Sequence, residues 1–490
     1  MSHAKKIAEN AAWLVLANTA QKAVSFIAFT VIARMVGVEV TGVYFYVISI
    51  SSIFVVFQDL GLTPVVIREI AADEERGRRV LGQALRLKFA LIPVVIAVTL
   101  LYAYVTGVTE TAFLAVALAC YVMSADTLHL IWYGAIRGKH ELRFEAAGMF
   151  IGQVATAIVG ILAAYAGYGV LGLVFALMVG STWHVFWSVS QARKIGLIPI
   201  YGAHPMRHML RDALPFGLAG IFVKIYSYVD SLMLKHIHGA TDVGEYAVAY
   251  KLTYALQFLP LAFVAALYPG MSSAAQNDRE SLPRILKGSL RVMMVAAVPL
   301  AALLSSLAYI LIPWIYGYQF VGSIAPLQVL PWVLIPIFLD FPIGSLLNAT
   351  HRAGKKTLSM GITMMINVIA NAMLIPSMGP TGAAWAGVIS FVSLFLLGWF
   401  FARQDIDSAW LFRLVLKGGG AALTTWLAVT YVTPAMSPAF LSVAFAGAMS
   451  IVTLFLFRLI MVKDVLFAIR WLKHKISPLA TEDEALHDKP

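Results

Sequence analysis

The sequence predicts an all-α polytopic membrane protein, and three observations lead to this fold class. First, 60% of the 490 residues are hydrophobic and only 12% are charged, about half the charged fraction of a soluble domain. Second, apolar runs long enough to cross a bilayer recur along the chain. Third, the pattern of the first six runs returns about two hundred residues later, with a lysine in the same place. Such a duplication is typical of transporters built from two bundles.

Fourteen apolar runs of roughly 17 to 25 residues predict fourteen transmembrane helices. The apolar part of the first run is too long for a signal peptide and no small-residue cleavage pattern follows it, so we expect it to stay as a span. The predicted spans are residues 11–35, 40–62, 83–106, 111–133, 144–166, 169–190, 212–235, 243–270, 288–311, 325–347, 358–377, 381–402, 413–433 and 438–461.

The 36 Lys and Arg residues give a net charge of +11, but their distribution does not favour nucleic acid as a partner. All but five lie in the termini and in alternate connections between spans. By the positive-inside rule, we expect both termini and these connections on the cytoplasmic side of the cell (inner or plasma) membrane. The five exceptions lie in spans or at their outer ends: Lys22, Arg34, Lys224, Lys235 and Lys251.

An internal repeat divides the chain. At a shift of about 202 residues, Lys22 aligns with Lys224 and Gly42 with Gly244. We therefore expect two six-helix bundles in the same orientation, related by an axis along the membrane normal. The predicted parts are residues 1–194 (N-terminal bundle), 195–211 (cytoplasmic linker), 212–404 (C-terminal bundle) and 405–490 (two further helices and a cytoplasmic tail).

Lys22 and Lys224 are the strongest functional signal, because each lies near the middle of an apolar run. A charge at that depth costs a few kcal/mol, so it should face protein or water. One interpretation is a structural pair with buried carboxylates. The other is a central cationic cavity between the bundles, which selects anionic cargo. Polar neighbours that we assign to this cavity are Asn18, Gln21, Ser25, Arg34 and Tyr228.

Three aspartates in the spans are candidate coupling groups or counter-ions. Asp126 and Asp340 fall in equivalent spans, and they can serve as partners of the two lysines, as proton carriers or as polar packing. Asp230 and Lys251 lie in consecutive spans, where we favour an intramembrane ion pair over contact with cargo. His129 and His184 have no metal-ligand spacing around them, and Cys120 is the single cysteine. We therefore expect no metal or other cofactor.

Two segments resemble a known family. Residues 59–71, DLGLTPVVIREIA, resemble the end of the second span in polysaccharide (O-antigen, Wzx-type) flippases. Residues 230–234, DSLML, and 244–252, GEYAVAYKL, resemble its counterpart in the second bundle. The resemblance implies the fold of the multidrug/oligosaccharidyl-lipid/polysaccharide (MOP) exporter superfamily and transport by alternating access. The implied cargo is a polyprenyl-(pyro)phosphate-linked oligosaccharide, moved from the cytoplasmic to the outer leaflet for cell-surface polysaccharide biosynthesis.

Other functions of the same fold stay open at this point. A multidrug or metabolite cation antiporter would use the three aspartates, and a lipid II flippase would use basic cavity residues. A membrane enzyme that handles lipid-linked sugars needs a larger outer loop than this chain has, so we expect no enzyme. The expected partners are membrane lipids and the lipid-linked oligosaccharide, with a polysaccharide polymerase and glycosyltransferases as further candidates. We expect a monomer that binds no nucleic acid.

Overall fold

A computed structural model describes residues 3–202, 206–433 and 439–461, with side chains described from Thr19 onward. Helices make up the described part of the chain. They are α1 (His3–Asp59), α2 (Leu62–Ala72), α3 (Glu74–Val105), α4 (Glu110–Gly138), α5 (Leu142–Tyr165), α6 (Gly169–Lys194), α7 (Arg207–Ile237), α8 (Ala240–Tyr254), η1 (Ala255–Gln257), α9 (Phe258–Asn277), α10 (Leu282–Ser306), α11 (Ala308–Ile315), η2 (Tyr318–Ser323), α12 (Ile324–Val329), η3 (Leu330–Val333), α13 (Leu334–Ala349), α14 (Ala353–Ala402), α15 (Ser408–Val432) and α16 (Ala439–Leu456).

Eleven helical segments of the described residues are long and apolar enough to cross a membrane. Two of these segments each contain two helices. The chain leaves the helical conformation at Gly37 (φ 81°, ψ 175°) in α1 and at Gly379 (φ 54°, ψ −132°) in α14. A positive φ is accessible to glycine at little cost, so each glycine permits a reversal between two spans. Counting both halves and adding α15 gives the fourteen predicted helices. That α15 crosses the membrane remains a prediction, because it is not among the eleven segments.

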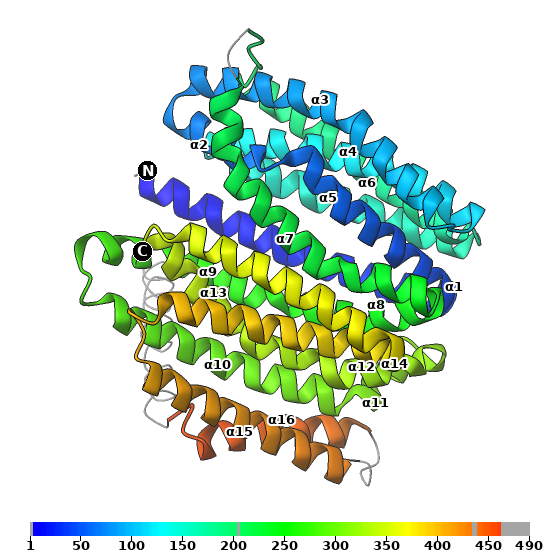
Figure 1. Ribbon diagram of the computed structural model, residues 1–490, viewed down its shortest axis with the longest axis vertical. Coiled ribbons are helices and arrows are strands. Elements are labelled where there is room, and N and C mark those ends of the chain that lie inside the picture. Colours follow the sequence, from blue (N-terminus) through cyan, green and yellow to red (C-terminus); the bar gives the residue numbers. More distant parts are fainter. Residues whose placement is uncertain (1–2, 203–205, 434–438, 462–490) are drawn as a thin grey trace, which may run out of the picture.

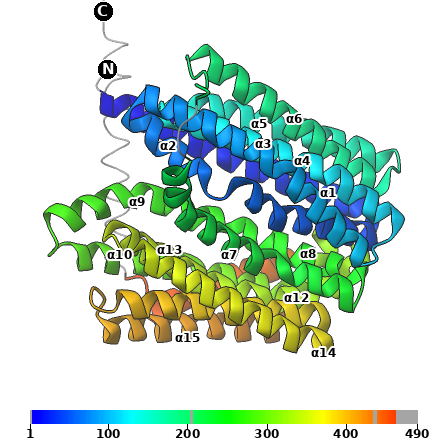
Figure 2. The same cartoon turned by 45° about the horizontal axis from the view of Figure 1, so that its top comes forward.

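The helices form two adjoining groups (Figure 1). In the first, α4 and α5 pack on α6, and the first half of α1 packs on α5; in the second, α14 packs on α7 and α13, and α13 packs on α10. The two groups meet where α1 and α2 contact α7 and α8. Helices α15 and α16 lie against α10 at the outer edge of the second group. Figure 2 shows α9 projecting at one margin of this group.

The molecule has one end rich in ion pairs, which we call the basic end. It carries the connections after α2, α4, α6, α9, α13 and α14. The opposite end carries Gly37, Gly379 and the connections after α3, α5 and α7. The ion pairs of the basic end hold neighbouring helices together, and they include Arg68 with Asp212, Lys139 with Glu74, Arg137 with Glu145, Lys287 with Asp407 and Arg352 with Asp405.

Candidate functional site

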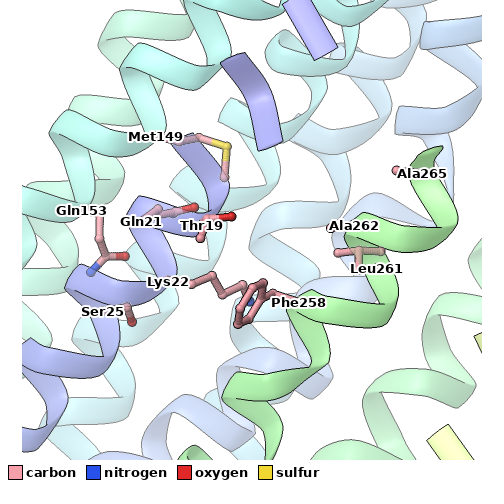
Figure 3. A pocket seen from close by; sticks show the side chains of 10 residues that line it. All are labelled: Thr19, Gln21, Lys22, Ser25, Met149, Gln153, Phe258, Leu261, Ala262 and Ala265. Carbon is pink, nitrogen blue, oxygen red and sulfur yellow. The ribbon is translucent and has the colours of Figure 1, made fainter. Parts of the chain in front are cut away.

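The lysine cavity, about 490 Å³ in volume, lies between α1, α5 and α9 (Figure 3). Lys22 extends from α1 across the cavity toward Phe258 of α9. One wall is polar and the other is apolar, so the cavity is amphipathic. Its lining residues are Thr19, Gln21, Lys22 and Ser25 from α1, Met149 and Gln153 from α5, and Phe258, Leu261, Ala262 and Ala265 from α9.

Helical spacing places the polar residues of α1 on this wall. Residues three or four apart share a face of a helix, so Ser25 lies one turn from Lys22 and Gln21. Asn18 belongs to the same predicted stripe, but its side chain lies outside the described residues. The Lys22 side chain is exposed to the cavity rather than paired, since no ion pair of the described side chains involves it.

Lys224 lies in a second cavity of about 250 Å³, which we call the aspartate cavity because Asp126 also lines it. The ammonium of Lys224 lies 5.4 Å from the centre of the Tyr228 ring, a cation–π distance. The lysine comes from α7 and the aspartate from α4, so opposite charges face each other across the two helix groups, and Lys224 attracts Asp126 electrostatically. The two predicted lysines therefore occupy separate cavities rather than one.

A third lysine, Lys251 of α8, lies close enough to Lys22 for the two charges to repel each other. Its ammonium is 5.2 Å from the centre of the Phe29 ring. The predicted ion pair between Lys251 and Asp230 is wrong. The Asp230 carboxylate accepts hydrogen bonds from the Tyr246 hydroxyl at 2.5 Å and from the Ser231 backbone N–H at 2.6 Å.

Helix geometry explains why that pair does not form. Tyr246 and Lys251 are five residues apart on α8 and therefore point in directions about 140° apart. Because Tyr246 faces Asp230, Lys251 turns toward α1. Its positive charge thus belongs to the region around Lys22.

The placement of Arg34 in the cavity is a second wrong prediction. Arg34 lies at the opposite end, where its guanidinium donates to the backbone carbonyls of Trp314 and Ile315 at 3.3 and 3.4 Å. The side-chain amide of Gln319 donates to the Arg34 carbonyl at 2.9 Å. Arg34 is twelve residues from Lys22, about 18 Å along the helix, so it cannot share the cavity. It joins the two helix groups instead.

Asp340 has a counter-ion, Lys356, that the sequence does not predict. Lys356 donates to both carboxylate oxygens at 2.6 Å, and both residues are buried. Lys88 is also buried, and its ammonium donates hydrogen bonds to Asp59 at 2.5 Å and to Thr127 at 2.6 Å. By their place in the sequence, both lysines belong to predicted basic connections. The sequence does contain a signal for these two pairs. Each lysine stands at the start of an apolar run, and its partner, Asp59 or Asp340, is the single aspartate of another predicted span.

No group of three or more His, Cys, Asp or Glu side chains in the described part of the chain could hold a metal ion. The site is therefore a set of cationic and polar cavities between two helix groups. Such an arrangement can bind an anionic, amphipathic molecule, because ammonium groups compensate its charge while the apolar wall contacts hydrocarbon.

A match to a known protein family shows to which family the chain belongs. Residues 7–275, more than half of the chain, match the family described as "Polysaccharide biosynthesis protein". The chain belongs to the polysaccharide biosynthesis protein family. The chain is a multi-pass membrane protein, and its family together with its flippase relative makes it a transporter and not an enzyme.

Two relatives and one solved structure extend the family assignment. The chain is 23% identical to the probable low-salt glycan biosynthesis flippase Agl15 of Haloferax volcanii, over 79% of this chain and 81% of the relative. It is 22% identical to the succinoglycan biosynthesis transport protein ExoT of Rhizobium meliloti, over 85% and 87%. Its fold is similar to the lipid II flippase MurJ in an inward closed conformation, with a TM-score of 0.75, 15% identity and coverage of 92% and 99%.

Proposed function

We propose that this family member is a flippase. It moves a polyprenyl-(pyro)phosphate-linked oligosaccharide from the cytoplasmic to the outer leaflet by alternating access. The observation that carries the proposal is the lysine cavity, which combines an exposed ammonium, polar side chains and an apolar wall. The names of the family and of the relatives Agl15 and ExoT support a glycan as part of the cargo.

Each part of such a cargo has a chemically suitable surface. The (pyro)phosphate carries negative charge, and Lys22 and Lys251 supply positive charge in a region of low dielectric, where the attraction is strong. Sugar hydroxyls can exchange hydrogen bonds with amide and hydroxyl groups such as those of Gln153 and Ser25. The site thus fits the charged head group and the first sugars.

The polyprenyl tail remains in the lipid beside α9. Three residues of this helix are buried, Pro260, Met271 and Ala274, while Leu261 is 58% exposed. An apolar, weakly covered helix beside a polar cavity allows the tail to stay in hydrocarbon while the head group crosses. The three residues of η1, a short 3-10 segment, separate α8 from α9.

The direction of transport follows from charge. The positive-inside rule assigns the basic end to the cytoplasm, so a cargo that starts in the cytoplasmic leaflet approaches the lysine cavity from that end. At the opposite end the two helix groups are joined by Arg34 and by close backbone contacts between α1 and α8. At the basic end the groups are also joined, by Arg68 of α2 and Asp212 of α7, so alternating access requires the two joints to open in turn. Glycosyltransferases would supply the cargo and a polymerase would consume it.

Leaflet accessibility tests the proposal. Proteoliposomes contain a lipid-linked oligosaccharide, and a glycan-modifying enzyme is added outside. Wild type and the control Lys417→Ala, an exposed lysine of α15, should expose the inner-leaflet pool, whereas the Lys22→Ala/Lys251→Ala double variant should lose most of this activity. Full activity of the double variant would exclude the lysines from the path. Absence of flipping, together with coupled uptake of an organic cation, would make the protein an antiporter.

A further inference from the structure

A separate polar site lies in the first helix group, on α4 and α6, away from the lysine cavity. Its residues are Asp126, His129 and His184. We propose that Asp126 binds a proton, that Lys224 competes with this proton for the carboxylate, and that the exchange couples proton movement to the relative motion of the two helix groups. The inference deepens the proposed function, on which it rests for its biological purpose, by naming the driving ion.

The Asp126 carboxylate is accessible to water and faces a cation of the other helix group. Its side chain is 40% exposed in the aspartate cavity, which Lys224 also lines. The Ser181 hydroxyl donates to one carboxylate oxygen at 2.6 Å. The ionised carboxylate therefore has one donor and one attracting ammonium, and both favour the charged form. Any motion that withdraws α7 removes the ammonium.

With its ring proton on Nε2, His129 presents Nδ1 as an acceptor for the protonated carboxyl group. Its Nδ1 atom lies 3.6 Å from an oxygen of Asp126, and it is buried without a hydrogen-bond partner. A carboxylic acid has one O–H to donate, and a neutral imidazole nitrogen is a good acceptor. A shift of a few tenths of an ångström would complete this bond. The site thus holds an unused acceptor where the proton would point.

Glycines on the neighbouring helix α5 leave room for the two imidazole rings and for Tyr133. The rings of His129 and His184 have centres 4.8 Å apart, and the Tyr133 hydroxyl lies 3.4 Å from Nδ1 of His184. Helix α5 presents glycine at both points of contact. A Cβ on Gly152 would lie 2.6 Å from the His184 ring, and one on Gly148 would collide with the Tyr133 hydroxyl. Larger residues at Gly148 or Gly152 would displace Tyr133 or the His184 ring.

The charged groups that face this site favour the aspartate over the histidines as the proton acceptor. Lys88 of α3 and Arg137 of α4 both act on His129 with positive charge, which opposes a proton on the imidazole. Both cations have acidic partners, Asp59 and Glu145, and so are fixed in place. Lys224 of α7 acts on Asp126 itself.

Binding of one proton to Asp126 changes the electrostatic attraction between the two helix groups. When a proton from cavity water binds a carboxylate oxygen of Asp126, the group becomes neutral and donates to His129. Lys224 then loses the charge that attracts it, so α7 is free to move relative to α4. Release of the proton on the other side restores the carboxylate and the attraction. No other bond forms or breaks, and the proton is the only species exchanged.

The test measures motion without cargo, so it is independent of flipping. Cys120, which is buried, is replaced by serine, and spin labels are placed at Arg143→Cys on α5 and Ala353→Cys on α14. Pulsed electron paramagnetic resonance then measures the distance between the two labels at a series of pH values between about 8 and about 5. We expect a pH-dependent change of distance, and Asp126→Asn should show the acid distribution at every pH.

Two further variants should move the midpoint of this change in opposite directions. Lys224→Gln removes the competitor and should raise the midpoint by about one pH unit or more, whereas His129→Phe removes the acceptor and should lower it. Tyr121→Phe, exposed on α4, is the matched control. A distance that does not change with pH, or a change that persists in Asp126→Asn, would overturn the proton site while leaving the flippase proposal to its own assay.

Discussion

Gly42 and Gly244 occupy equivalent positions in the two repeats and pack against each other's helices at the opposite end of the molecule. A Cβ on Gly42 would collide with the carbonyl of Ala240 and lie 2.8 Å from the backbone nitrogen of Gly244. A Cβ on Gly244 would collide with the carbonyl of Val38. The duplicated hairpins therefore contact each other through the same glycine, as expected for bundles related by a two-fold axis.

Gly42→Ala and Gly244→Ala should each destabilise the protein. In an exposed helix this exchange stabilises by up to about 1 kcal/mol, but here the added methyl group meets backbone, and overpacking costs about 1–3 kcal/mol. We expect a lower midpoint of thermal unfolding and slower transport, because the joint between the groups is forced apart.

Gly288→Ala is the matched control for these two variants. Gly288 also lies in a helix, but a Cβ there would have no neighbour within 4 Å. Its unfolding midpoint should stay the same or rise. If the two joint variants also keep or raise their midpoints, the close approach of α1 and α8 is not a feature of the folded protein.

The sequence predicted the helices well, because they depend on local hydrophobicity. Gly42 and Gly244 could be aligned from the chain alone, but their mutual contact could not, since it depends on how the repeats dock. Lys88 and Lys356 were misplaced because charge counting cannot tell a lysine that begins a span from one in a connection. Asp230 was misassigned because a tyrosine hydroxyl is a neutral donor that no charge pattern reveals.

Arg34→Ala should weaken the joint at the opposite end. The two long, exposed hydrogen bonds of Arg34 to the carbonyls of Trp314 and Ile315 contribute no more than about 1 kcal/mol, or roughly fivefold in a population ratio. We therefore expect an increase of up to roughly fivefold in labelling of Ser25→Cys by an impermeant maleimide added from outside, in a Cys120→Ser background.

Arg413→Ala controls for the loss of an exposed arginine. Arg413 hydrogen-bonds to the carbonyl of Ala409 in its own helix and does not join the two groups. Its labelling rate should equal that of the parent. Equal rates for Arg34→Ala and the parent would show that Arg34 is not part of the joint.

Asp407 should give the unfolding midpoint a pH dependence in the acid range. The backbone N–H of Trp410 and the ammonium of Lys287 hold the pKa of this carboxyl below its ordinary value, which is about 3.9. A lowered pKa means that the contribution to stability is fully present above the ordinary value and is lost as the pH falls through the lowered one.

Asp407→Asn separates this titration from helix capping. Asparagine can still accept the N–H of Trp410 as an N-cap, but it cannot ionise. The difference in unfolding midpoint between wild type and Asp407→Asn should therefore be constant near neutral pH and shrink below about pH 3.9. A difference that does not vary with pH would mean that the charge of Asp407 does not contribute.

The buried pair of Asp340 and Lys356 should show strong coupling. Because Lys356 donates to both oxygens of Asp340 at 2.6 Å, removal of one partner leaves an uncompensated charge, which costs about 3–5 kcal/mol. Lys356→Met and Asp340→Asn should each lower the unfolding midpoint severely. The double variant leaves neither charge, so it should lose much less than the sum. Lys355→Met, an exposed neighbour on α14, should be near neutral. Additive losses in the double variant would show that the two residues stabilise the fold independently, and Asp340 would then again be a candidate for a coupling role.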